Sequence, residues 1–288
     1  MSDVGSGLVH GAVSIVNAIS IGRGAALGID LETVAEVLLV EDNRDVQAVT
    51  DIPNEDTKLV TSAAQEVLKK YDEGANFGAK VTIQSEIPIG KGLKSSSAAA
   101  SAVVIGTLCA LDKKASDQEI VEMGVTAARR AGVTITGAYD DASACYFGGA
   151  VATDNREMSL LKRTKIEEDL SVIIYVPEDT MYTKDFDVGR IKPFGSSVES
   201  ALELALKGEY WRAMTLNGLI HSSVLSISTE PVVEAMTHGA LGCGLSGTGP
   251  AIAAVAFPEN AKEIADSWSS LLGEVIVTKV NNDSARCL

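Results

Sequence analysis

The segment PIGKGLKSSSAAASAVV at 88–104 combines residue types that can hold a phosphate group. Gly90 and Gly92 let the backbone approach an anion without interference from a Cβ atom. The serines that follow, at 95–97, stand where a helix begins, so free N–H groups and the positive end of the helix dipole lie beside their hydroxyls. The segment therefore predicts a phosphate cradle. An ordinary strand-to-helix turn capped by serine is the alternative.

Two other glycine-rich stretches resemble binding loops. GCGLSGTGPAIAAV at 242–255 is dense in Gly, Ser and Thr for a plain hairpin loop. We interpret it as a second cradle facing the first, because a triphosphate and its acceptor need donors from more than one side. GRGAALG at 22–28 imitates a dinucleotide fingerprint, but the next predicted strand begins at Thr33. No crossover helix fits in between, so we expect no nicotinamide site.

Two adjacent carboxylates, Asp140 and Asp141, lie in GAYDDASACYFGG. A carboxylate can orient or deprotonate an acceptor hydroxyl during phosphoryl transfer. Neighbouring like charges that share a site raise the pKa of one of them, although adjacent side chains can also point apart. Asp140 has the alternative of capping the short helix that follows.

Composition excludes several classes of protein. The chain has 288 residues and a net charge of −15, with no basic stripe, so we expect no nucleic-acid partner. The longest apolar run, 98–111, is too short to span a bilayer, and the N-terminus lacks a signal-peptide pattern. We therefore expect no membrane partner and a cytoplasmic location. The four cysteines form no metal-ligand spacing, and we expect reduced, mostly buried thiols.

Hydrophobic periodicity predicts an α+β protein. The predicted strands are 13–19, 33–40, 80–86, 171–176, 251–256 and 274–280. The predicted helices are 56–71, 95–111, 117–131, 197–206, 210–224, 232–237 and 261–271. SDQE at 116–119 is a capping box, and Pro231 suits the first turn of a late helix.

A charged stretch at 152–170 suggests how the chain divides. We place the boundary there and predict an N-terminal ATP-binding lobe at 1–155 and a C-terminal lobe at 156–288. The same stretch could equally form a hairpin. From Leu170 onward the order strand, helices, strand, helix, strand resembles a split βαβ arrangement.

Three motifs together resemble those of the GHMP kinase superfamily. PIGKGLKSSSA resembles its P-x-x-x-G-L-x-S-S-A signature, LSGTGP resembles its third motif, and HGAVSIVNAISIGRGAALGIDL lies where its first motif belongs. Within it, GAVSIVNAISIGRGAA, SEIPIGKGLKSSSAAASA and GAYDDASACYFGG are most similar to the archaeal-type shikimate kinases. The resemblance implies an N-terminal lobe like ribosomal protein S5 domain 2 and a ferredoxin-like C-terminal lobe. It also implies ATP- and Mg²⁺-dependent phosphorylation of the 3-hydroxyl of shikimate, a small-molecule substrate.

The resemblance also implies roles for individual residues. Asp141, seven residues before Gly148, matches the proposed base of mevalonate kinases, with Asp140 as the second catalytic candidate. Arg23 is the candidate for the substrate carboxylate, since a planar guanidinium suits it; a surface arginine is the alternative. Ser96 is the candidate Mg²⁺ ligand. The implied ATP-binding residues are Pro88, Ile89, Gly90, Lys91, Gly92, Leu93, Lys94, Ser95, Ser96, Ser97 and Ala98, and the third-motif loop contributes Ser246, Gly247, Thr248 and Gly249.

One departure from the superfamily concerns the metal. Several members keep a Mg²⁺-binding glutamate about eleven residues before the aspartate, where this chain has Arg129 and Arg130. Glu119 and Glu122 are substitutes, although Glu119 also belongs to the capping box. The alternatives left open are a GHMP kinase for homoserine, pantoate or mevalonate, and a non-catalytic sugar sensor. A homo-oligomer is compatible with the sequence.

Overall fold

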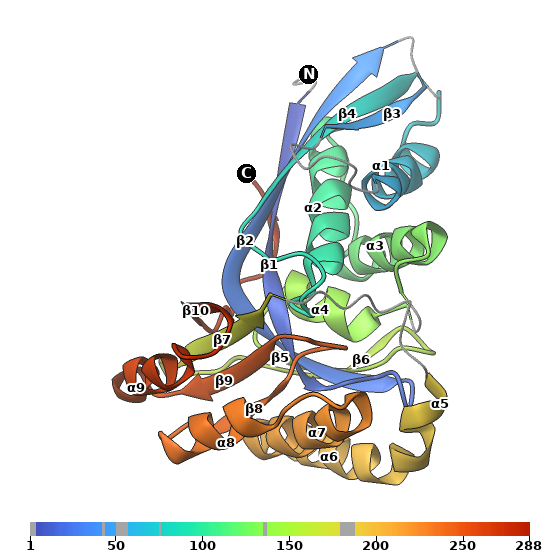
Figure 1. Ribbon diagram of the computed structural model, residues 1–288. Coiled ribbons are helices and arrows are strands. Elements are labelled where there is room, and N and C mark those ends of the chain that lie inside the picture. Colours follow the sequence, from blue (N-terminus) through green and yellow to red (C-terminus); the bar gives the residue numbers. More distant parts are fainter. Residues whose placement is uncertain (1–3, 42–43, 50–56, 75, 135–136, 179–187) are drawn as a thin grey trace.

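The computed structural model describes residues 4–41, 44–49, 57–74, 76–134, 137–178 and 188–288, and it contains two β-sheets (Figure 1). The larger sheet has the order β11-β1-β2-β4-β3, and β5 and β6 extend it from the other part of β2. Its strands are β1 (Val4–Val16), β2 (Arg23–Glu41), β3 (Val46–Val49), β4 (Phe77–Ser85), β5 (Ala150–Asp154), β6 (Ser159–Thr164) and β11 (Arg286–Cys287). Among the strand pairs formed by the described residues of this sheet, only β3–β4 is parallel.

The long strand β2 explains the false dinucleotide fingerprint. GRGAALG begins just before β2 and runs into it, so the segment lacks the helix that follows the glycines of a dinucleotide-binding motif. The first residues of β2 pair with β5, and the residues after Thr33 pair with β4. One strand therefore serves both halves of the larger sheet.

Four helices cover one face of this sheet: α1 (Lys58–Tyr71), α2 (Ser95–Ala110), α3 (Asp117–Ala131) and α4 (Tyr139–Phe147) (Figure 1). Helix α2 packs directly on β1, where a Cβ atom at Gly5 or Gly7 would lie 2.3 Å from backbone atoms of α2. Most of α2 is buried, so the apolar run at 98–111 forms core. Among the residues described, no helix combines the length and the apolar character needed to cross a bilayer.

The smaller sheet is wholly antiparallel, in the order β10-β7-β9-β8. Its strands are β7 (Ser171–Pro177), β8 (Gly242–Leu245), β9 (Ile252–Ala256) and β10 (Gly273–Lys279). The remaining helices are α5 (Val188–Ile191), the 3₁₀ helix η2 (Lys192–Phe194), α6 (Gly195–Lys207), α7 (Tyr210–Leu225), α8 (Glu230–Thr237) and α9 (Pro258–Trp268). The split βαβ arrangement is present, but the predicted order of strand, helices, strand, helix, strand lacked one strand, because Gly242–Leu245 of the third-motif stretch forms β8.

The charged stretch at 152–170 forms most of the β5–β6 hairpin, so the hairpin alternative is the observed one. The predicted division at residue 155 falls in its turn. The C-terminal strand β11 also returns to the larger sheet, where Cys287 pairs with Gly7 of β1. The division into an N-terminal lobe at 1–155 and a C-terminal lobe at 156–288 stays a prediction.

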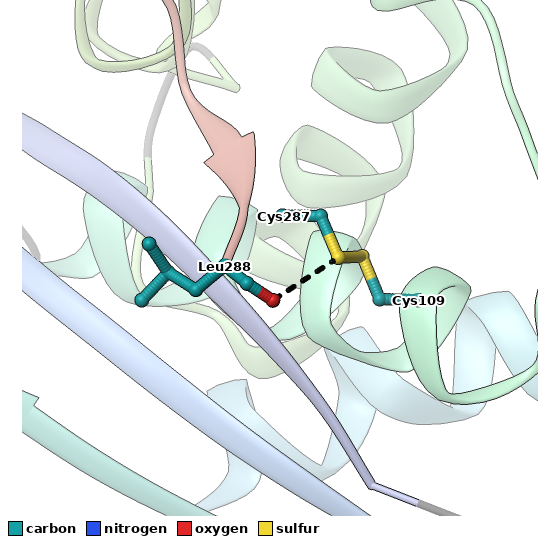
Figure 2. The surroundings of a disulfide bond; sticks show 3 residues. All are labelled: Cys109, Cys287 and Leu288. Carbon is teal, nitrogen blue, oxygen red and sulfur yellow. Dashed lines mark hydrogen bonds between the residues drawn. A yellow bond between two sulfur atoms is a disulfide. The ribbon is translucent and has the colours of Figure 1, made fainter. Parts of the chain in front are cut away.

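The prediction of four reduced thiols is wrong for one pair. Cys109, near the end of α2, and Cys287 of β11 form a disulfide (Figure 2). They are 178 residues apart in the chain, and only the return of the C-terminus to β1 brings them together. Cys145 and Cys243 are free and buried, as predicted.

Several local predictions are confirmed. Ser116 and Glu119 form both hydrogen bonds of the capping box at the start of α3, and Pro231 lies in the first turn of α8. Every predicted helix is present to within about three residues at each end, the usual precision of a boundary. The short helix expected after Asp140 is α4, whose bounds were not predicted; it begins at Tyr139 and therefore contains both adjacent carboxylates.

Candidate active site

Ser14, in β1, ties three distant segments of the chain together. Its backbone N–H donates to Ser246 Oγ at 3.1 Å. Its own Oγ accepts hydrogen bonds from the N–H of Gly247 and from Lys94 Nζ, both at 2.9 Å. The first motif, the serine-rich loop and the third-motif loop therefore meet at one hydroxyl. Sequence reasoning missed Ser14, because one serine in an apolar strand carries no signal of its own.

Lys94 joins this cluster to the adjacent carboxylates. It precedes α2 in the left-handed conformation, with φ 67°. Its Nζ lies 2.9 Å from Asp141 Oδ1, and the side chain of Lys94 is only 6% exposed, against 22% for Asp141. A lysine predicted to hold phosphate is thus the ion-pair partner of the predicted base.

Asp140 is the buried member of the carboxylate pair, and it is hydrogen-bonded to Asn155. Its Oδ1 accepts from Asn155 Nδ2 at 2.7 Å, and its N–H donates to Asn155 Oδ1 at 3.0 Å. The helix-capping alternative is wrong, because the N-cap of α4 is Ala138 and no side chain caps the helix. Burial, followed by the charge of Asp141, raises the pKa of Asp140 to about 7. Asp140 therefore keeps its proton to a higher pH than an ordinary aspartate.

The raised pKa makes stability depend on pH. Asp140 contributes stability that is complete below its unfolded pKa and is lost as pH rises to about 7, because its charged form is desolvated. Asn mimics the protonated acid and does not ionise. As the pH rises from 5 to 8, the free energy of unfolding of wild type should therefore fall by up to about 3 kcal/mol relative to that of Asp140→Asn. Urea titrations at both pH values measure this. A difference that does not change with pH would contradict the assignment.

The start of α2 has the features of an anion site. Gly90 and Gly92 have positive φ angles of 69° and 84°. No side chain caps α2, and its first turn contains no acidic residue but three serines. Free N–H groups, hydroxyls and the positive end of the helix dipole suit the phosphates of ATP. Lys91 points elsewhere, since its Nζ donates to the carbonyl oxygens of Pro177 and Glu178.

Gly92 allows the third-motif loop at 246–249 to lie against the predicted phosphate loop at 88–98. A Cβ atom at Gly92 would lie 2.1 Å from the carbonyl oxygen of Ser246. Ser246 Oγ donates to the Gly92 carbonyl at 2.7 Å, and the N–H of Ala251 donates to the Lys91 carbonyl at 3.1 Å. The loops are therefore packed together. From the sequence, the predicted reason for Gly92 is the space that a bound anion needs. The contact between the two loops is a second reason for a glycine at this position.

Gly92→Ala should therefore lower the free energy of unfolding by more than the backbone strain alone accounts for. Gly132 is a matched control, because its φ of 74° is similar but a Cβ there would meet nothing within 4 Å. We expect Gly132→Ala to lose about 1 kcal/mol of unfolding free energy. Gly92→Ala should lose at least about 2 kcal/mol more and should weaken ATP binding, because the Ser246 backbone must move. Equal losses in the two variants would contradict the packing argument.

Arg23, the first residue of β2, already has a partner. The neighbouring Gly24 packs so closely on Asp140 that a Cβ atom would lie 2.3 Å from Oδ2. Arg23 Nη2 lies 2.7 Å from each carboxylate oxygen of Glu199, on α6, and both side chains are about one-third exposed. An incoming carboxylate would share the guanidinium with Glu199. The alternative Arg130 is paired with Glu66 at 2.9 Å.

Glu119 and Glu122, the acidic candidates for binding Mg²⁺, already have hydrogen-bond partners in the protein. Glu119 is held by its capping box and by Lys70, whose hydrogen bond lowers the pKa of Glu119 to about 2. Glu122 accepts a hydrogen bond from Gln118 at 2.7 Å. Ser96 is half-buried at the start of α2, where a hydroxyl oxygen suits a hard cation. This limited set fits Mg²⁺, which proteins commonly hold through few side chains plus substrate phosphates.

Helix α7 contributes two buried polar residues that sequence reasoning missed. Asn217 Oδ1 accepts from the N–H of Asn17, just after β1, at 3.1 Å. His221 Nδ1 lies 3.0 Å from the carbonyl oxygen of Asn217. Burial lowers the pKa of His221, and the charge of Lys94 lowers it further. Asn217 Nδ2 and His221 Nε2 have no hydrogen-bond partner among the described residues, and periodicity could identify them only as core positions.

Comparison with known proteins supplies independent findings. The family model for the GHMP kinases N terminal domain matches residues 58–149. The chain is 43% identical to a shikimate kinase of Methanosarcina acetivorans, over 99% of this chain and 97% of that protein. It is 42% identical to a shikimate kinase of Pyrococcus furiosus, over 95% of this chain and 98% of that one.

Solved structures show the same fold at lower identity. A homoserine kinase from Cytophaga hutchinsonii superimposes with a TM-score of 0.78 at 19% identity, covering 100% of this chain and 98% of its own. An L. major mevalonate kinase gives 0.76 at 17% identity, covering 97% and 96%. These likenesses concern the fold. They confirm the mixed α/β, two-sheet architecture expected from the motifs.

Proposed function

Because the chain belongs to the shikimate kinase family of the GHMP kinases, we propose that it transfers the γ-phosphoryl group of ATP to the 3-hydroxyl of shikimate. The product is shikimate 3-phosphate, an intermediate on the way to chorismate and the aromatic amino acids. The family relation extends over nearly the whole chain. The proposal includes Mg²⁺ as cofactor and a cytoplasmic location.

The observation that carries this proposal is the meeting of Lys94, Asp141 and Ser14. Three sequence motifs that lie far apart in the chain converge there through bonds of 2.9 Å. A helix start without a capping side chain adjoins the same residues. Phosphoryl transfer needs this combination of an anion cradle, a cation and a carboxylate, because positioning and charge stabilisation provide most of the catalysis.

Each residue has a role that its surroundings support. Asp141 is charged, is partly exposed and is held in place by Lys94, so it can accept the proton of the attacking hydroxyl. Lys94 can hold a phosphate oxygen and stabilise negative charge that develops beside Asp141. ATP is the phosphoryl donor, and a bound Mg²⁺, with Ser96 as its candidate ligand, would supply neutralisation of charge on the phosphates. The N–H groups and hydroxyls at 95–97 hold those phosphates.

Capture of shikimate depends on local charge. Shikimate is an anion, and the net charge of −15 provides no long-range attraction. Arg23 is the proposed partner of its carboxylate. Its two hydrogen bonds to Glu199 keep the guanidinium in one orientation, but Glu199 also competes with the substrate.

Three substitutions test this role of Arg23. We expect Arg23→Lys to raise the KM for shikimate, because lysine keeps the charge but loses the planar fork. Glu199→Gln should lower it, since the competing carboxylate is removed. The KM for ATP should not change in either variant. If Arg23→Ala leaves the KM for shikimate unchanged, the carboxylate binds elsewhere, with Arg129, Arg130 or Arg190 as the next candidates.

The acceptor itself is tested by a coupled ADP-release assay with shikimate, homoserine, pantoate and mevalonate. We expect turnover with shikimate at a kcat/KM far above the others. The likeness in fold to homoserine and mevalonate kinases makes those acceptors the second candidates. Binding of shikimate without ADP release would instead indicate a sensor. Sedimentation of the same sample measures whether the chain forms a homo-oligomer.

A further inference from the structure

A histidine and two carboxylates form a second cluster outside the active site. His10 lies on β1, and Asp30 and Glu32 lie on β2. One ligand atom from each residue lies within 4.8 Å of the other two. The strands are irregular at this point, because His10 pairs with Glu32 and Gly11 with Ile29, which leaves Asp30 and Leu31 of β2 without a partner on β1.

The imidazole of His10 is buried without a hydrogen bond. Its side chain is 5% exposed, and Nδ1 has no hydrogen-bond partner among the described residues. Nε2 faces Asp30 Oδ1 and Glu32 Oε1, each at 3.6 Å. A hydrogen bond between nitrogen and oxygen would be about 2.7–3.2 Å long. Both carboxylates therefore lie too far away to be simple acceptors of an imidazole N–H.

The same distances suit ligands that share a cation. Zn²⁺ binds histidine nitrogen and carboxylate oxygen at about 2.0–2.2 Å, so neighbouring ligand atoms of a tetrahedral site are about 3.4 Å apart. The two 3.6 Å separations from Nε2 come close to this value. A fourth position would remain for water, because Asp30 and Glu32 are 55% and 44% exposed.

The local charge also favours a cation. A third carboxylate is close, since Glu86 Oε2 accepts a hydrogen bond from the N–H of Glu32 at 3.0 Å. Within the described part of the chain, no lysine or arginine forms an ion pair with Asp30, Glu32 or Glu86. Without a cation, like charges would gather beside a buried imidazole, which is unfavourable.

We propose that His10, Asp30 and Glu32 bind a divalent transition-metal ion of the Zn²⁺ type that links β1 to β2 at their irregularity. Imidazole with carboxylates suits such ions, whereas Mg²⁺ prefers an octahedral shell of oxygens. The site is separate from the ATP-dependent chemistry, since none of its residues belongs to the phosphate loops or contacts Asp141. Its role is to stabilise the larger sheet.

The test uses the untagged full-length protein, freed of metal by a chelator and titrated with Zn²⁺ in a calorimeter. We expect one site per chain and a melting temperature that rises with Zn²⁺, because a ligand that binds only the folded state stabilises it. X-ray absorption of the complex should show one imidazole with oxygen ligands. Mg²⁺ at the same concentration should neither raise the melting temperature nor displace Zn²⁺.

Variants locate the ion. His10→Gln and Glu32→Gln should each lower Zn²⁺ affinity by at least about 100-fold, since even second-shell changes cost 10- to 100-fold. His238→Gln is the matched control, because His238 also neighbours a carboxylate, Glu234 at 3.8 Å, yet lies half-exposed outside the cluster. It should leave the affinity unchanged. The absence of Zn²⁺ binding to wild type, or equal affinity in wild type and His10→Gln, would overturn the proposal.

Discussion

Replacement of Asp141 by Asn should lower kcat by about 10²–10⁴, the range for a group that takes a proton in the transition state. The substitution preserves shape and removes the charge that accepts the hydroxyl proton. The KM for shikimate should change far less. Asp141 meets the geometric requirement, because it is the partly exposed member of the pair and is oriented by Lys94 at 2.9 Å. Steady-state kinetics with shikimate and ATP–Mg²⁺ measure both constants.

Asp140→Asn is the control for this experiment. Asp140 is buried against Asn155, so its loss should affect the pH dependence of stability more than turnover. A residual kcat well above that of Asp141→Asn is expected. If the Asp140 variant is inactive and the Asp141 variant is active, the assignment of the proton transfer to Asp141 is wrong.

Lys94→Met should impair both activity and stability. Loss of a cation that stabilises developing charge typically costs about 10²–10³ in kcat. Its removal also leaves the Asp141 carboxylate beside Asp140 without a counter-ion, at a site where Lys94 is 6% exposed. We expect the free energy of unfolding to fall by about 3 kcal/mol, as for other broken buried pairs. Chemical denaturation and steady-state kinetics measure the two effects.

The double variant Lys94→Met with Asp141→Asn separates the two effects. Removal of both charges leaves no unpaired ion, so much of the lost stability should return. Activity should remain at least as low as in either single variant. Strictly additive losses of stability would show that the ion pair does not couple the two residues in the folded protein.

Most of the local structure could be predicted from the sequence because its causes are local. The capping box at 116–119, the helix start after Lys94 and the apolar character of α2 depend on residues close in the chain. The glycine-rich loops were also visible, since few residue types accept positive φ. The bounds of α4 could not be predicted, and Asp140 was expected before the helix rather than within it, because this helix is short and weakly amphipathic.

The sequence by itself determined the family and the α+β class, and it identified the glycine- and serine-rich loop and the aspartate pair as site candidates, because these depend on motifs and short-range periodicity. Only the tertiary structure decided which side chains from distant parts of the chain meet. It paired Lys94 with Asp141, Arg23 with Glu199 and Cys109 with Cys287, and it placed Ser14 between the loops. The partners in these contacts are between 47 and 233 residues apart. Local patterns carry no information about contacts over such separations, because these depend on how the two sheets and their helices pack.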